Sequence, residues 1–479
     1  MKEVELIFIC KECIGDGFLN ERRSKEGENH KCKYCGKTDI TVSLVWLSEE
    51  IHNAIEKHFN LTPTEPEGFE YYLLKDKESD FNWTRKGEEV KILIGDIADI
   101  SVELAEDVQK YLSLYYGGNP MDFEEDPYGE EACYEEKSPE SYYFQESWDS
   151  FCNEVRFKAR YFGSSTMEVL ETLFGNLVNL KTFNGTSVIV NAGPNTQYSH
   201  ILRARVCLTQ SDLEQVLKNP IKELASPPSK YAKRGRLNSE GISVFYGAEN
   251  TDTCIAEVRP PVGSNVVIGK FEIIRNLRLL NLDLLTQVYA RGSFFDPEFK
   301  TRIGHVAFLK HLVDEFTKPV MPGDEAFEYL PTQIVAEYLA EKVEPKLDGI
   351  IFRSSQSGEE VKNITLFRNA CQIKQFVISP KIKVDIGYGW YSDDDDYDGI
   401  TSVEELYDSK KEHNSEFSAE FEEDIEGYVL DNYEPSLLLD LKRGLDVRKI
   451  NSVGYETLER SVNWYRKEKS ESSDEFFDN

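Results

Sequence analysis

Four cysteines near the start of the chain have the spacing of a metal site. Two Cys-x2-Cys pairs, Cys10 with Cys13 and Cys32 with Cys35, are separated by 18 residues, which is typical of a zinc ribbon. In a ribbon each pair lies on a tight turn, from which two thiolates reach one tetrahedral metal ion, and Gly36 would permit the second turn. The polar stretch between the pairs is too small for an apolar core, so bound zinc would stabilise it. Such a closed site is structural, and the alternative is four reduced, metal-free cysteines.

A second group of residues forms a basic region in an acidic chain. Residues 200–240 contain eight Lys or Arg and four Asp or Glu, a local charge of +4, whereas the whole chain has a formal net charge of −32. Arginines bind phosphate through bidentate, charge-assisted hydrogen bonds. The charge alone therefore indicates either a site for an anionic ligand, such as a nucleotide pyrophosphate, or ordinary surface ion pairing. The basic residues include Arg203, Arg205, Lys230, Lys233, Arg234 and Arg236.

Several motifs follow one another in a set order around this basic region. They are LRAR at 202–205, GRLNSEG at 235–241, VFYGA at 244–248, TCIAEV at 253–258, LPTQ at 330–333, DGIIFRSS at 348–355 and NITLF at 363–367. Over about residues 195–380 their joint order and spacing resemble the RES domain, a family named for its Arg, Glu and Ser residues. The resemblance implies a core like that of ADP-ribosyltransferases. It also implies an enzyme that degrades NAD by phosphorolysis or hydrolysis of the nicotinamide glycosidic bond.

The resemblance assigns roles to individual residues. Arg203, Glu257 and Ser354 match the family arginine, glutamate and serine, and they are the expected catalytic residues. Since Ser354 and Ser355 are adjacent, either one could be the family serine. Arg205 follows Arg203 by two positions and is either a second phosphate ligand or part of a structural ion pair. The expected substrate-binding residues are Arg205, Arg236, Tyr246, Ser355 and Asn363.

These residue types suit the cleavage of a nicotinamide–ribose bond. Positive charge develops on the ribose C1 in the transition state, and the Glu257 carboxylate could bind a ribose hydroxyl and stabilise that charge. Arg203 and Arg236 could hold the pyrophosphate. Tyr246 could stack on the nicotinamide ring, and Ser354 could orient the ribose or the ring. The alternatives are a salt bridge at a strand end for Glu257, core packing for Tyr246 and a turn hydroxyl for Ser354.

The elements that must position these residues divide the chain into four expected parts. Residues 1–45 are the zinc ribbon, 46–180 a mainly helical domain, 181–385 the RES domain and 386–479 an acidic, partly helical extension. From 148 to 162 apolar residues recur at three- and four-residue steps, as on one face of a helix. This segment resembles the HEPN-type helical domain that precedes some RES domains. Many HEPN domains are ribonucleases with an R-x4–6-H pair, which this helical region lacks, so a sensor or oligomerisation module is favoured.

The sequence pattern after about residue 181 predicts an α+β fold. Short β-rich runs bounded by Gly, Pro, Asn or Ser are interrupted by helical stretches. Because these runs do not alternate regularly with helices, a doubly wound parallel sheet is not expected. The glycine-rich fingerprints of Rossmann and P-loop nucleotide sites are also missing from the sequence.

Composition and charge exclude further classes. With 479 residues, of which 40% are hydrophobic, the chain can form cores in about three domains. Its acidity argues against broad binding of nucleic acid or anionic lipid. Residues 121–140 (nine acidic, one basic) and 391–430 (fifteen acidic, two basic) carry much of that charge and are expected to be solvated. No secretory signal or membrane span is expected, and five scattered cysteines indicate a reduced, cytoplasmic protein.

Three hypotheses follow. The first is an NAD-degrading enzyme with inorganic phosphate or water as acceptor, acting as a bacterial toxin or in anti-phage growth arrest. It would be a homo-oligomer controlled by a trigger protein or an antitoxin, with zinc as its structural metal. The second is a catalytically inactive sensor of NAD or ADP-ribose that recruits a partner through the ribbon. The third, HEPN-type RNA cleavage, is disfavoured by the missing Arg–His pair.

Overall fold

The computed structural model is a mixed α+β protein, as the sequence predicted. None of the helices in the residues it describes is both long enough and apolar enough to cross a membrane. Ser355 and most of the expected acidic extension lie outside the residues that the structure describes. The structure describes residues 7–75, 81–118, 125–139, 141–159, 166–321, 323–354, 356, 361–375, 381–386, 401–405, 433–441, 443–454, 462 and 464.

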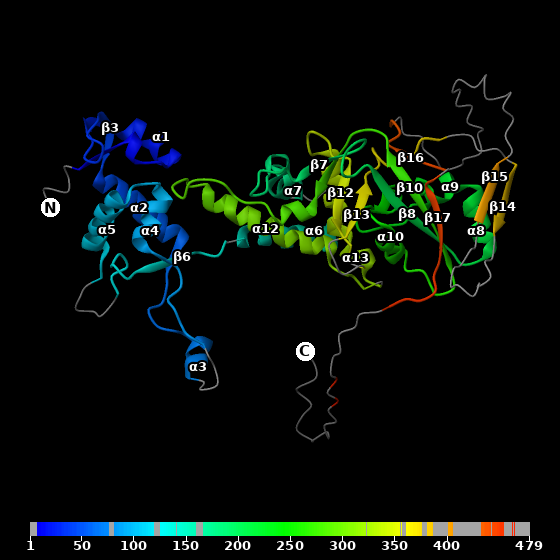
Figure 1. Ribbon diagram of the computed structural model, residues 1–479, viewed down its shortest axis with the longest axis horizontal. Coiled ribbons are helices and arrows are strands. Elements are labelled where there is room, and N and C mark those ends of the chain that lie inside the picture. Colours follow the sequence, from blue (N-terminus) through cyan, green and yellow to red (C-terminus); the bar gives the residue numbers. More distant parts are fainter. Residues whose placement is uncertain are drawn as a thin grey trace, which may run out of the picture.

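The first part of the chain combines two small antiparallel sheets with a group of helices (Figure 1). The strand orders are β1-β3-β2 and β4-β6-β5. Side-chain oxygens of Asp16, Ser43 and Ser101 accept backbone N–H bonds and cap α1, α2 and α5. The elements are β1 (Phe8–Cys10), η2 (Lys11–Cys13), α1 (Gly17–Glu26), β2 (Glu28–Lys31), β3 (Thr38–Ser43), α2 (Leu44–His58), β4 (Phe59–Leu61), α3 (Phe69–Lys75), β5 (Glu88–Glu89), α4 (Val90–Ala98), α5 (Val102–Tyr116) and β6 (Cys133–Glu136).

One apolar core joins the cysteine-bearing sheet to the helices that follow it. Ile9 and Leu19 from the first sheet region pack in the same buried cluster as Ile51 of α2 and Leu93 of α4. The expected boundary between residues 45 and 46 therefore lies inside α2, which is part of this shared core. The four-part division of the chain stays a prediction.

The second part is built on one large sheet with the strand order β16-β10-β8-β9-β13-β12-β11-β7, and β17 also pairs with β10. Among these pairs β11 and β12 are parallel and the others antiparallel. A two-stranded sheet, β14-β15, lies beyond it (Figure 1). The elements are α6 (Tyr142–Phe157), α7 (Thr166–Phe174), η3 (Leu177–Asn179), β7 (Ile189–Ala192), β8 (His200–Cys207), α8 (Gln210–Lys218), α9 (Pro220–Leu224), η4 (Ser229–Tyr231), β9 (Phe245–Ala248), α10 (Thr251–Val258), β10 (Asn265–Ile273), β11 (Leu277–Asn281), α11 (Leu282–Leu285), α12 (Phe299–Thr317), α13 (Glu325–Glu328), α14 (Leu330–Glu341), β12 (Gly349–Arg353), β13 (Lys362–Leu366), β14 (Ile382–Ile386), β15 (Thr401–Glu405), β16 (Leu437–Leu439) and β17 (Leu445–Lys449).

The large sheet opens between β8 and β9. These strands share a single register pair, Leu202 with Ala248, whereas β8 and β10 are paired along eight residues. Helix α10 covers this place, and its Cys254 packs in a small buried cluster with Ala248 and Val266 of the sheet. Strands that part in this way leave backbone groups unpaired and create space for side chains and ligands.

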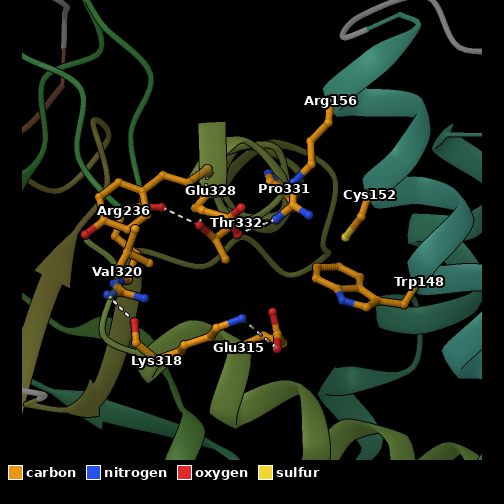
Figure 2. Close-up of a pocket in the computed structure, with 11 residues that line it drawn as sticks. Trp148, Cys152, Arg156, Arg236, Glu315, Lys318, Val320, Glu328, Pro331 and Thr332 are labelled. Atoms are coloured by element: carbon orange, nitrogen blue, oxygen red, sulfur yellow. Dashed lines mark hydrogen bonds and ion pairs between the residues drawn. The ribbon is translucent and has the colours of Figure 1, made fainter. Parts of the chain in front are cut away.

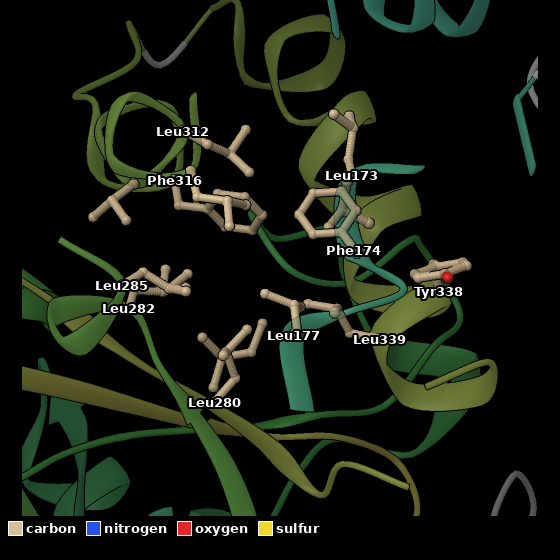
Figure 3. Packing of buried hydrophobic residues seen from close by; sticks show 14 of the residues in the cluster. Leu173, Phe174, Leu177, Leu280, Leu282, Leu285, Leu312, Phe316, Tyr338 and Leu339 are labelled. Carbon is tan, nitrogen blue, oxygen red and sulfur yellow. The ribbon is translucent and has the colours of Figure 1, made fainter. Parts of the chain in front are cut away.

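Helices α6, α7, α12 and α14 pack against the sheet at β11 and β12. Trp148, Phe151 and Val155 of α6 are buried, as the helical period predicted. They join the same core as α12 and α14, although α6 belongs to the segment expected to form a separate helical domain. Figure 3 shows residues around α7, β11, α11, α12 and α14 interdigitating in this core. Helix α6 is thus a structural part of the sheet-bearing half of the molecule.

A loop before α12 connects the two halves. Phe294 and Phe295 pack into the core of the first part, where Phe294 lies edge-on to His58 at 5.3 Å. Lys57 donates a hydrogen bond to the carbonyl of Pro297 (3.0 Å). From this contact α12 runs back toward the large sheet (Figure 1). Its 19 residues correspond to about 28 Å at 1.5 Å per residue.

Candidate metal site and candidate active site

The four N-terminal cysteines converge as the sequence predicted. Their Sγ atoms all lie within 4.8 Å of one another. Individual Sγ–Sγ distances are 3.9 Å for Cys10–Cys13, 3.8 Å for Cys13–Cys32 and 3.3 Å for Cys10–Cys35. Four thiolates around a zinc ion at about 2.3 Å would be about 3.8 Å apart. The cluster could therefore hold a metal ion such as zinc.

Local backbone geometry produces this convergence. Lys37 accepts a hydrogen bond from the N–H of Cys32 (2.8 Å), and Gly36 donates to the carbonyl of Cys32 (3.1 Å), which closes the second turn. Gly36 has a φ of +73°, a left-handed conformation that favours glycine. Burial tends to raise the pKa of Cys32, but backbone N–H groups at Cys35, Cys10 and Tyr34 outweigh it and lower that pKa to about 7. The lower pKa raises the fraction of Cys32 that is thiolate, the form that binds metal, near neutral pH.

A cavity of about 410 Å³ lies where the large sheet opens. Its wall combines β8, β9, α10, β12 and β13 with the 234–236 turn and the segment that follows α12. Arg205 is exposed on β8 and does not line the cavity, and Ser355 is outside the described residues. The predicted residues that do line it are Arg203, Arg236, Tyr246, Glu257 and Asn363.

The Glu257 carboxylate is held by two buried side chains. Ser354 Oγ and Asn363 Nδ2 each donate a hydrogen bond of 2.6 Å to its Oε1. Glu257 comes from the last turn of α10, and Arg259 bonds to Gln356 instead of to Glu257, so the alternative of a salt bridge at a strand end does not apply. The structure therefore brings two of the three expected catalytic residues, Glu257 and Ser354, into direct contact.

Arg203 supplies positive charge where β8 and β9 separate. Its guanidinium donates to the carbonyl of Tyr246 (3.1 Å) and lies over the ring of Phe245, 4.9 Å from the centroid. In the described part of the chain no carboxylate forms an ion pair with it. Burial lowers the pKa of Arg203 to about 10, which still leaves it charged at neutral pH. A desolvated guanidinium without a counter-ion is a favourable place for an anionic ligand.

The turn that carries Arg236 is fixed by the hydroxyl of Tyr246. This hydroxyl accepts from the N–H of Leu237 (3.0 Å) and donates to Asn238 Oδ1 (2.9 Å). Gly235 is required in the turn because a Cβ there would lie 2.7 Å from the Tyr246 oxygen. The expected stacking of Tyr246 on a nicotinamide ring stays a prediction. The Tyr246 hydroxyl stabilises the turn through its two hydrogen bonds.

Two further residues of the site had no role in the sequence analysis. Thr332 Oγ1 donates to the carbonyl of Arg236 (2.7 Å) and Gln333 Nε2 to that of Gly235 (2.7 Å). Both are buried at the start of α14. The LPTQ motif contained them, yet nothing in the sequence shows that its partner is a turn nearly 100 residues earlier. Arg234 and Arg259 also line the cavity and add to its positive charge.

A smaller cavity of about 10 Å³ adjoins the larger one. The two share Arg236, Val320 and Tyr329. Figure 2 shows Arg236, whose guanidinium donates to the carbonyl of Lys318 (2.8 Å), on one side and Arg156 and Cys152 of α6 on the other. Arg236 also lies over the ring of Tyr329, 4.9 Å from the centroid.

The comparison with protein families supports the RES resemblance. Residues 213–386 match the model of the RES domain family. Glu257, Ser354, Arg236, Tyr246 and Asn363 lie within the matched residues, whereas β8, with Arg203 and Arg205, precedes them. No curated protein and no solved structure matches the chain. The match does not extend to the cysteine cluster or to the helices that resemble a HEPN-type domain.

Proposed function

We propose that this protein cleaves the nicotinamide–ribose bond of NAD. One observation carries the proposal: a glutamate held by a serine and an asparagine faces a cavity whose walls also present Arg203 and Arg236. NAD needs both features, because it has an anionic pyrophosphate and a ribose that becomes positively charged when its bond to nicotinamide breaks. The RES match over residues 213–386 supports the same reaction class.

The proposed mechanism assigns one task to each group. Arg203 and Arg236 bind the pyrophosphate, and the Glu257 carboxylate binds a hydroxyl of the nicotinamide ribose. The C1–N bond breaks with its electron pair leaving on the nicotinamide, which departs as a neutral molecule. The carboxylate stabilises the resulting charge on the ribose ring. Ser354 and Asn363 are positioning residues that fix the carboxylate before substrate binds, so that little reorganisation is needed.

An oxygen of the acceptor then forms the new bond to C1. With water the product is ADP-ribose and a proton is released. With inorganic phosphate a phosphate ester forms at C1, and the arginine-rich wall, which includes Arg234 and Arg259, offers places for that anion. Loss of cellular NAD would arrest growth, so the proposal includes a role as a bacterial toxin or anti-phage effector controlled by a trigger or an antitoxin. The cysteine cluster would carry a structural zinc ion.

The test is to incubate the purified full-length protein with NAD, with and without phosphate, and to resolve the products by mass. Nicotinamide with ADP-ribose would indicate hydrolysis, and nicotinamide with a phosphorylated ADP-ribose would indicate phosphorolysis. Intact NAD in both reactions, together with calorimetric binding of NAD, would contradict the proposal. That outcome would favour a catalytically inactive sensor of NAD.

A further inference from the structure

The smaller cavity in Figure 2 contains an ion pair that the proposed reaction does not use. Arg156 of α6 contacts Glu328 of α13, with 2.9 Å between Nη2 and Oε2. Their side chains are only 21% and 32% exposed, so the pair is shielded from solvent on most sides. Helix α6 lies before residue 213, where the RES match begins. A residue outside the matched family domain thus reaches its candidate site.

Arg156 holds the segment that supports Arg236. Its guanidinium pairs with Glu328 and also lies 5.3 Å from the ring centroid of Phe327. Tyr329, which follows Glu328 in the chain, places its ring beneath the guanidinium of Arg236. The position of Arg236 therefore depends on a short segment that Arg156 fixes from the opposite helix.

The charges in this cavity give the pair a second consequence. Glu328 and Arg236 line the same small space, and Arg236 also faces the larger cavity. A carboxylate without its partner would be drawn to the nearest available guanidinium, since desolvated charges interact strongly at short range. If Glu328 paired with Arg236, the Arg236 guanidinium would be partly neutralised and turned away from the larger cavity.

We propose that Arg156 is a positioning residue for anion binding: it keeps the Glu328 carboxylate away from Arg236 and so leaves Arg236 available for a phosphate-bearing ligand. This inference rests on the part of the proposed function in which Arg236 binds the pyrophosphate. It goes further by adding α6 to the site and by giving the Arg156–Glu328 pair a role in affinity for the ligand.

The test is a double-mutant cycle read by calorimetric binding of inorganic pyrophosphate to the full-length protein. Arg156→Ala should weaken binding about tenfold, because Glu328 then competes for Arg236. Glu328→Gln alone should not weaken it, and Arg156→Ala/Glu328→Gln should return to within about twofold of the wild type. Arg156→Lys should retain most of the affinity. The control is Arg302→Ala, which removes an arginine from an ion pair with Asp296 at the other end of α12 and should leave pyrophosphate binding unchanged.

A double variant that binds pyrophosphate as weakly as Arg156→Ala would overturn the proposal, because the loss of affinity would then come from packing alone. Unchanged binding in Arg156→Ala, or a wild type that does not bind pyrophosphate, would overturn it as well. Should Arg156→Ala fail to fold, Arg156→Gln keeps most of the side chain and tests the same point. If NAD is cleaved, Arg156→Ala should raise KM with kcat retained. Pyrophosphate results that follow the cycle without any NAD cleavage would contradict only the proposed reaction.

Discussion

The cysteine cluster and the arginine-lined cavity are two sites built in opposite ways. The four thiols lie within 26 residues, on two turns whose geometry is set by neighbouring backbone groups. The cavity collects side chains from Arg203 to Asn363, and these meet only because the sheet opens between β8 and β9. The first site depends on local conformation and on the ion it could bind. The second depends on the packing of the whole sheet-bearing half.

The two sites also differ in the charge of the ligand that each would bind. Thiolates would bring negative charge that a divalent cation neutralises, whereas Arg203 is a half-buried cation without a carboxylate partner in the described residues. The cavity is positive in a protein whose formal net charge is −32. Changes to the cysteines should therefore act on folding, and changes to the cavity should act on binding and chemistry.

The largest effect is expected at the cysteine cluster. Cys13→Ser should abolish metal binding and destabilise the first part of the chain by several kcal/mol, because structural zinc contributes about 10–16 kcal/mol in small zinc domains. The loss should reach α2, since Ile9 and Ile51 share one core. Metal content and thermal unfolding provide the measurements, with Cys133→Ser, an isolated thiol, as the control. Metal content equal to that of the wild type would contradict the prediction.

A large effect on binding is expected at Arg203. Arg203→Ala removes the half-buried guanidinium that lines the cavity and should lower kcat/KM for NAD about 10²-fold, the scale of a lost charge-assisted contact in a largely desolvated site. Arg205→Ala, on the same strand but exposed, is the matched control and should stay within about twofold. Steady-state kinetics and calorimetry distinguish the two variants. Equal losses of kcat/KM in the two variants would contradict the prediction, because the effect would then come from disturbing strand β8 and not from the cavity.

A smaller effect is expected where a side chain supports the site from behind. Tyr246→Phe keeps the ring but leaves the N–H of Leu237 and Oδ1 of Asn238 without their partner. The cost should be about 1–3 kcal/mol in stability, with a several-fold rise in KM because the turn carrying Arg236 loosens. Denaturant unfolding and kinetics measure the two changes. A variant with lower kcat and unaltered stability would instead indicate direct contact with the reacting group.

How much could be predicted from the sequence differs between the two sites for the same physical reason. Cysteine spacing encodes a local turn, so Cys10, Cys13, Cys32 and Cys35 could be assigned directly, and their convergence followed. For the cavity the order of motifs indicated Glu257 and its neighbours, but it did not show that Glu257 lies in the last turn of α10.

Contacts between distant segments account for what the sequence analysis missed. Thr332 and Gln333 bond to a turn nearly 100 residues away, and Arg156 pairs with a residue 172 positions later. The side chains alone carry no sign of these partners, because any buried polar group needs some partner and the sequence does not say which. The single pairing between β8 and β9, which creates the cavity, is likewise a property of the assembled sheet.

The most direct test of the account is the rate of NAD loss in Glu257→Gln compared with Glu240→Gln, an exposed glutamate outside the cavity. The glutamine keeps the size of the side chain but removes the charge that would stabilise the ribose cation. We predict at least about 10³-fold slower NAD cleavage in Glu257→Gln, with NAD binding and thermal stability close to the wild type, and an unchanged rate in Glu240→Gln. Cleavage of NAD by Glu257→Gln at the wild-type rate would contradict the account.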